Sequence, residues 1–112
     1  MDDLRRFPRA PLTGPVKFFN WDRPMQADAL EISPEGIFLK TGQALPEGAL
    51  LTLRLTLPGW AQAFTVLGKV VRTVRGGLLR PAGMGVRFID ISATARASIW
   101  EYVARRALPR AA

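Results

Sequence analysis

Apolar and polar residues alternate most regularly in the middle of the chain, over residues 51–57. Leucine occupies every second position there, and threonine or arginine fills the positions between. A period of two is typical of a strand that buries one face and exposes the other. We therefore expect a strand whose leucines point into the core: Leu51, Leu53, Leu55 and Leu57.

Other segments of strand-forming character lie on both sides of this strand. The other expected strands, in chain order, are 16–21, 26–32, one that begins at Ile37, 63–74 with a bulge at Gly68, and 84–89. The turns and loops that separate the strands are 22–24, 33–36, 42–48, 58–59 and 75–83. This layout gives six or so antiparallel strands, and a sheet of that size usually closes into a barrel, which removes its exposed edges.

A helical periodicity follows the last expected strand. Ser92 is a suitable N-cap, because its hydroxyl can accept a hydrogen bond from the first turn of a helix. The residues that recur at the spacing of one helix face are Ala95, Ile99, Tyr102, Val103 and Arg106. The fold class is therefore all-β with a C-terminal helix at 92–107.

The first 15 residues combine prolines with arginines. Proline fixes φ and removes a backbone donor, so this stretch is expected to be extended rather than a helix or a central strand. Residues 1–12 have little apolar surface to bury apart from Phe7, and we expect them to be mobile without a ligand. The expected organisation is a single domain over 1–112, with a flexible arginine-rich arm at 1–15, a barrel at 16–90 and the helix at 92–107.

The composition is that of one compact domain. The chain has 112 residues, of which 48% are hydrophobic, and this is enough for one core. Arg, Lys, Pro or Gly interrupts the apolar stretches, so no segment is expected to cross a bilayer as a helix, and no signal-peptide pattern is present. We therefore expect a cytoplasmic protein with no membrane insertion.

The chain contains neither cysteine nor histidine. Their absence excludes a disulfide framework, the usual zinc ligands and the common nucleophile–base pairs of enzymes. The nine acidic residues are scattered, and no two of them are marked as a pair of catalytic carboxylates. We expect neither enzymatic activity nor a bound cofactor or metal.

The net charge of +7 comes mostly from arginine, since lysine occurs only at positions 17, 40 and 69. The planar guanidinium of arginine matches phosphates and guanine edges and stacks on flat rings. The charge therefore indicates an anionic partner, such as a nucleotide, a nucleic acid or an acidic protein. A coding bias toward arginine with solvated surface charges gives the same composition. Only the positions of the arginines can therefore distinguish an anionic partner from a coding bias.

Two short motifs occur in order along the chain, an R-x-x-x-R in the arm and an E-x-S-x-x-G at the turn after the second expected strand. Their residues are Arg5, Arg6, Arg9, Glu31, Ser33 and Gly36. In order and spacing the chain resembles the PilZ family, whose signature is R-x-x-x-R before the first strand and [D/N]-x-S-x-x-G at the second-to-third strand turn. The Gly-Val-Arg-Phe at 85–88 also looks like a late strand of that family.

The resemblance implies a six-stranded antiparallel β-barrel, commonly with a C-terminal helix, that binds the second messenger cyclic di-GMP. In such a site Arg5 and Arg9 would grip guanine and phosphate, with Arg6 assisting. The residues of the E-x-S-x-x-G motif would form the wall on the barrel side. Taken alone, the arm arginines also fit a solvated tail, and the turn motif also fits an ordinary turn closed locally by its serine.

The chemistry of the ligand suits these residue types. Guanine presents O6 and N7 as acceptors for an arginine fork, and its N1–H and N2–H donors suit a carboxylate such as that of Glu31. Ser33 can add a hydroxyl contact, and Gly36 permits close approach of the backbone with a positive φ. One position departs from the family pattern, since Glu31 stands where most ligand-binding members have Asp or Asn.

Three functions are open on this reasoning. The first, which we expect, is a cyclic di-GMP receptor that relays the signal in trans to an unidentified effector protein. The second, favoured by Glu31, is a ligand-free adaptor for motility or envelope machinery that binds only proteins. The third is a small barrel that binds single-stranded nucleic acid, and the basic and aromatic residues for it are Lys17, Phe18, Phe19 and Trp21.

Overall fold

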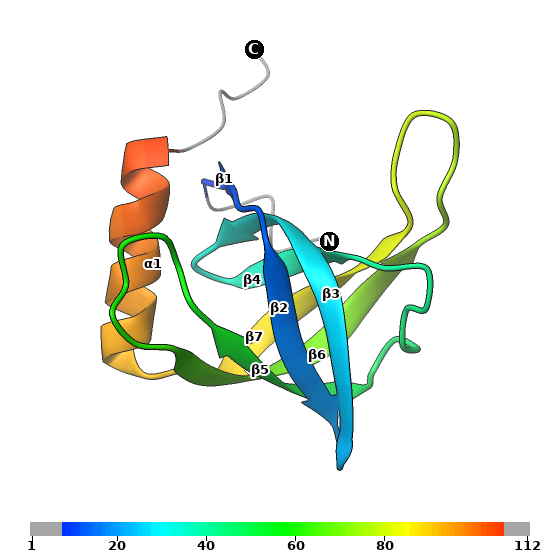
Figure 1. Cartoon of the computed structure of the whole chain (residues 1–112), viewed down its shortest axis with the longest axis horizontal. Coiled ribbons are helices and arrows are strands. Elements are labelled where there is room, and N and C mark those ends of the chain that lie inside the picture. The colour runs from blue at the N-terminus through cyan, green and yellow to red at the C-terminus, as the bar shows by residue number, and fades with distance from the viewer. Residues whose placement is uncertain (1–7, 107–112) are drawn as a thin grey trace.

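The structure is a computed structural model that describes residues 8–106 (Figure 1). Its strands and helix, in chain order, are β1 (Ala10–Pro11), β2 (Pro15–Asn20), β3 (Arg23–Ser33), β4 (Gly36–Lys40), β5 (Leu50–Leu55), β6 (Phe64–Val74), β7 (Gly83–Asp90) and α1 (Ala93–Arg106). The strands and the helix expected from the sequence are present, and β1 is an addition to them.

Six of the strands close into an antiparallel barrel. Around the barrel the order is β3, β2, β5, β6, β7 and β4, and β4 pairs again with β3 to complete the circle. The two-residue β1 pairs with β3 outside this circle, and α1 stands at one side of the barrel (Figure 1). The expected six-stranded antiparallel barrel with a C-terminal helix is therefore confirmed.

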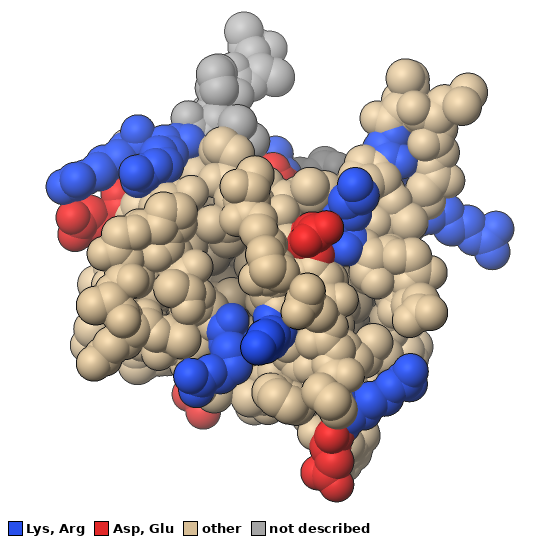
Figure 2. All heavy atoms as spheres, viewed as in Figure 1, with Lys and Arg blue, Asp and Glu red and all other residues tan. Residues whose placement is uncertain are grey.

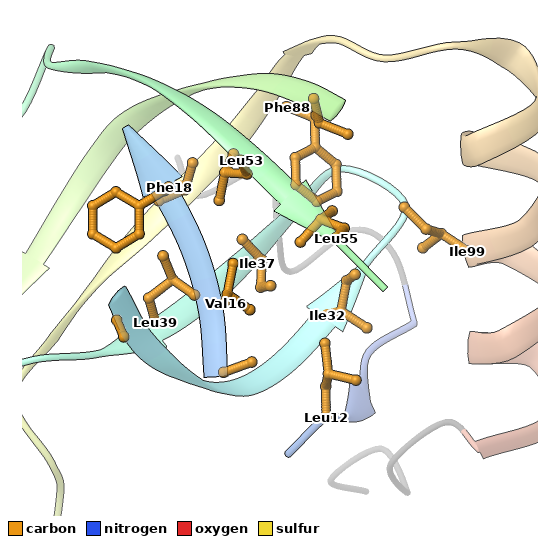
Figure 3. Packing of buried hydrophobic residues seen from close by; sticks show 14 of the residues in the cluster. Leu12, Val16, Phe18, Ile32, Ile37, Leu39, Leu53, Leu55, Phe88 and Ile99 are labelled. Atoms are coloured by element: carbon orange, nitrogen blue, oxygen red, sulfur yellow. The ribbon is translucent and has the colours of Figure 1, made fainter. Parts of the chain in front are cut away.

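The barrel interior is filled by the alternating leucines and their neighbours (Figure 3). The four leucines of 51–57 are at most 1% exposed, which confirms that they point inward. In the ladder, Leu53 lies between Phe18 of β2 and Val66 of β6, and all three side chains are buried. The period-two pattern thus fixes which face of β5 forms the core.

Two local predictions are also confirmed. The register of β6 against β7 shifts between Leu67 and Gly68, which is the expected bulge. A Cβ atom at Gly68 would lie 2.5 Å from Cγ1 of Val86, so the wall leaves no room for a side chain there. At the start of α1, the Ser92 hydroxyl accepts a hydrogen bond of 3.0 Å from the Ala95 N–H, as expected of an N-cap.

The helix buries the face that the sequence predicts. Ala95, Ile99, Tyr102 and Val103 are buried, and α1 contacts β3 and β1. Arg106, at the end of the same face, is exposed, and its guanidinium carbon lies 4.6 Å from the centre of the Tyr102 ring. Within residues 8–106, no helix is long and apolar enough to span a membrane.

The first described residues contact the barrel, whereas the sequence led us to expect that they bury little. β1 pairs with β3, and the side chains of Ala10 and Leu12 are buried. The expectation overlooked Leu12, whose N–H also donates a hydrogen bond of 3.0 Å to the carbonyl of Leu30. Pro11 is compatible with β1 because this strand lies at the edge of the sheet, where the missing donor of proline is tolerated. The mobility expected of residues 1–7 lies outside the described residues.

Tyr102 ties α1 to β1, because its hydroxyl donates a hydrogen bond of 2.8 Å to the carbonyl of Pro11. Tyr102→Phe leaves this carbonyl without that donor, so we expect the free energy of unfolding to fall by about 0.5–1.5 kcal/mol. Urea denaturation at equilibrium measures the change. Thr94→Ala, at an exposed position of the same helix, is the control and should change stability by less than about 0.5 kcal/mol. Equal stability of Tyr102→Phe and the parent chain would contradict this prediction.

The turn between β2 and β3 lies earlier than expected, at 21–22 instead of 22–24. Pro24 lies near the start of β3 and does not end the strand. β3 pairs with β4 only from Asp28 onward, so the missing backbone donor of Pro24 removes no hydrogen bond to β4. Trp21 occupies the turn with a φ of 58° and is 92% exposed. A bulky residue rarely adopts this left-handed conformation, for which glycine, asparagine and aspartate are the usual choices.

Candidate functional site

The pairing of β1 with β3 brings the two sequence motifs together. The register places Pro11 opposite Glu31, and Arg9 precedes Pro11 by two positions. Nη1 of Arg9 lies 2.9 Å from Oε1 of Glu31, in an ion pair whose side chains are 42% and 26% exposed. This contact places one residue of the arm motif beside one residue of the turn motif. Arg5 and Arg6, the other arginines of the predicted site, lie outside the described residues.

Ser33 closes the turn that follows β3. Its buried hydroxyl accepts a hydrogen bond of 3.1 Å from the backbone N–H of Glu35, so the interpretation as a locally closed turn is confirmed. Gly36 opens β4 and is paired with both Ser33 and Arg87. Within the part of the chain that the structure describes, glycines with positive φ occur at Gly14, Gly48 and Gly59. The positive φ expected at Gly36 is therefore wrong, because this residue already belongs to the strand ladder.

An open hollow of about 300 Å³ adjoins the ion pair on the outer wall of the barrel. Its lining comes from β3, β4, β6 and the loop between β6 and β7, and consists of Leu30, Glu31, Phe38, Arg72, Val74, Arg80 and Pro81. Only Glu31 of this set was expected from the sequence. A signal for Arg72 was present, since it is an arginine within the apolar run Val70-Val71-Arg72-Thr73-Val74, but its role depended on which strand lies beside it.

The hollow combines a flat apolar wall with positive charge. The guanidinium carbon of Arg72 lies 5.9 Å from the centre of the Phe38 ring, which is a cation–π arrangement. Arg72 and Arg80 contribute positive charge to the lining, and Glu31 contributes the carboxylate. Such a surface can stack a planar base, hold phosphate oxygens and accept hydrogen bonds from ring N–H groups.

Phe18 and Phe19, two aromatic residues considered for nucleic acid, lie on opposite faces of β2. Phe18 is buried in the barrel, whereas Phe19 is partly exposed, because neighbouring residues of a strand point to opposite faces. Trp21 lies in the β2–β3 turn, and its side chain is exposed. Phe18 is therefore excluded from base stacking, which weakens the nucleic-acid hypothesis relative to the other two.

A family model for the PilZ domain matches residues 3–105. The chain belongs to the PilZ domain family. The resemblance seen in the two motifs is thus confirmed over almost the whole chain. No curated protein sequence matches it.

Solved PilZ structures share the fold of this domain. The Bacillus subtilis inhibitor of motility, MotI/DgrA, gives a TM-score of 0.78 at 19% identity, over 90% of this chain and 50% of that chain. The PilZ domain of YcgR from Escherichia coli, solved with c-di-GMP, gives 0.73 at 13% identity, over 91% and 90%. The PilZ domain of CeSA from a cellulose-synthesizing bacterium gives 0.58 at 21% identity, over 87% and 95%. The chain therefore spans about half the length of MotI/DgrA, and likeness at these identities establishes the shared fold.

Proposed function

We propose that this PilZ domain binds cyclic di-GMP on the outer wall of the barrel, at the hollow beside Arg9 and Glu31, and relays the binding to a partner protein. The observation that carries the proposal is the Arg9–Glu31 contact, because it joins the two family motifs at the edge of a hollow with suitable chemistry. The YcgR domain of the same fold was solved with c-di-GMP, which supports this choice of ligand. Binding of this kind involves no catalytic step. A receptor for this intracellular messenger would act in the cytoplasm.

Binding would exchange the partners of Arg9 and Glu31. An ion pair as exposed as theirs stabilises a protein by no more than about 1 kcal/mol, so a ligand can separate it at low cost. The released guanidinium would then hold guanine O6 and N7 or a phosphate, while the carboxylate accepts the N1–H and N2–H donors of guanine. Phe38 and Arg72 would flank the base, and Ser33 and Gly36 would act by holding the turn at the end of β3.

The same ion pair favours a second candidate function, that of an adaptor that binds only proteins. Arg9 and Glu31 form an ion pair with each other, so neither side chain needs a nucleotide as its partner. The structural neighbour MotI/DgrA is named as an inhibitor of motility, and motility machinery is therefore one class of partner for either function.

Titration calorimetry of cyclic di-GMP into the purified chain tests the receptor function. Arg9→Ala is expected to weaken binding by roughly ten- to a hundredfold, because it removes a charged partner of a hydrogen bond. Arg23→Ala is the matched control, since Arg23 is an exposed arginine at the opposite end of β3, and it should leave the affinity unchanged. Equal losses in both variants would show that only net charge matters and would count against the site.

Glu31→Asp is expected to tighten binding of cyclic di-GMP. The shorter side chain separates the carboxylate from the Arg9 guanidinium, now 2.9 Å away, and restores the acceptor length that is typical of the family. The same calorimetric titration measures the effect. If neither the parent chain nor Glu31→Asp binds the nucleotide at high concentration, the receptor function is wrong and the adaptor function replaces it.

A further inference from the structure

The loop between β6 and β7 carries two fully exposed leucines. Leu78 and Leu79 are 104% and 100% exposed, more than any other large hydrophobic side chain that the structure describes. Figure 1 shows the loop projecting from the barrel on the side away from α1. These leucines contribute nothing to the core, and exposed apolar side chains at such a position indicate a contact with something outside the chain.

The backbone holds both leucines at the tip of the loop. The N–H of Gly77 donates a hydrogen bond of 2.9 Å to the carbonyl of Arg80, which leaves Leu78 and Leu79 as the two residues of a tight turn. Below the tip the two arms of the loop lie close together, since a Cβ atom at Gly76 would be 3.0 Å from the backbone nitrogen of Ala82. The tip thus lies at the end of two closely spaced backbone segments that continue from β6 and β7.

The charged residues within the loop itself are both arginines. Arg75 and Arg80 flank the leucines, and no acidic residue occurs between Val74 and Gly83. In Figure 2 the projecting loop has an uncharged tip, basic side chains nearer the barrel and no acidic side chain on the displayed face of the loop. An apolar tip flanked by two cations is complementary to a surface with anionic groups outside and an apolar layer beneath them.

We infer that this loop docks on an anionic membrane surface. Leu78 and Leu79 enter the boundary between headgroups and acyl chains, while Arg75 and Arg80 remain at the level of the lipid phosphates. This contact needs no spanning segment, so it is compatible with the finding that no helix of residues 8–106 is long and apolar enough to cross a membrane. The inference goes beyond the proposed nucleotide binding and does not depend on it.

The shape of the tip favours a membrane over a protein groove. A specific protein interface buries about 800 Å² on each partner around an apolar centre, and two leucines on a convex tip supply far less. A fluid bilayer needs no complementary shape and accepts a small projecting group. The β2–β3 turn offers a useful contrast, because it also exposes a large apolar residue, Trp21, but next to the acidic Asp22.

Co-sedimentation of the full chain with vesicles, without nucleotide, tests the inference. We expect binding to vesicles of phosphatidylcholine mixed with phosphatidylglycerol, weaker binding to phosphatidylcholine alone, and weakening by added salt. The double substitution Leu78→Ser and Leu79→Ser should reduce the partition coefficient at least about tenfold. Replacing Arg75 and Arg80 with glutamine should reduce it about tenfold on the mixed vesicles only.

Trp21→Ser is the matched control, since it removes a highly exposed apolar side chain from the β2–β3 turn, and it should leave vesicle binding unchanged. Thermal melts followed by circular dichroism check that each variant is folded. Full binding by the double serine variant would mean that the net charge alone adsorbs the protein, and the inference would be wrong. Loss of vesicle binding in Trp21→Ser would also overturn the inference. Failure of the parent chain to bind the mixed vesicles would overturn it too, and would leave a protein groove as the partner of the tip.

Discussion

Replacing Leu53 with alanine is expected to lower the free energy of unfolding by about 2–5 kcal/mol. Leu53 is fully buried at the centre of β5, between Phe18 and Val66 in the ladder. Its removal leaves a cavity inside a barrel whose strands form a closed circle, and the hydrogen-bonded wall relaxes only partially to fill it. For a domain of this size each kcal/mol corresponds to about 4–8 °C in melting temperature, so the loss is readily measured by thermal or urea denaturation.

Leu50→Ala provides the control for this substitution. Leu50 belongs to the same strand and is the same residue type, but it is 51% exposed. Its truncation removes little buried surface and leaves no cavity, so the change should be below about 0.5 kcal/mol. Similar losses in the two variants would mean that strand propensity, rather than the packed interior, determines the stability of β5.

Gly83→Ala is expected to destabilise the domain by about 1–3 kcal/mol, although it adds a single methyl group. Gly83 is buried at the start of β7, where it pairs with Lys40 and Val74. A Cβ atom there would collide with the carbonyl oxygen of Leu39 and would lie 2.7 Å from the ring of Phe38. The backbone carbonyl cannot move without breaking the β4–β7 ladder, so the strain falls on the strand itself.

Urea denaturation again measures the effect, with Gly42→Ala as the control. Gly42 lies in the loop after β4, has ordinary backbone geometry, and would bring its Cβ atom within 4 Å of nothing. Alanine there should be neutral or slightly stabilising, because it restricts the unfolded chain. Equal stability of Gly83→Ala and Gly42→Ala would mean that the packing of β4 on β7 leaves room for a Cβ atom at position 83.

Local chemistry was the part of the fold that could be predicted. The alternation at Leu51–Leu57, the bulge at Gly68 and the N-cap at Ser92 each depend on a residue and its near neighbours in the chain. The turn at Trp21 was misplaced because residue preference points to Asp22-Arg23-Pro24, whereas the register of β2 against β3 decides where the chain reverses. The burial of Leu12 was missed because it depends on the pairing of β1 with β3.

The candidate site could be predicted only in part, for a similar reason. Arg9 and Glu31 were found because they belong to two ordered motifs that the family signature joins. Phe38, Arg72 and Arg80 belong to separate segments that meet only when the barrel closes, so neither spacing nor periodicity brings them together. A single sequence contains no measure of which strand lies beside which, and a site assembled across strands is therefore only partly visible in it.

Arg80 belongs to two surfaces at once, since it lines the hollow and also flanks the leucine tip of the β6–β7 loop. A nucleotide that draws its guanidinium toward a phosphate in the hollow takes one cation from the tip. A membrane that holds the same guanidinium at its headgroups takes one cation from the hollow. Linkage then requires that each ligand weaken the other by the same factor. On this account cyclic di-GMP would act as a release signal, and the domain would respond to it by leaving the membrane.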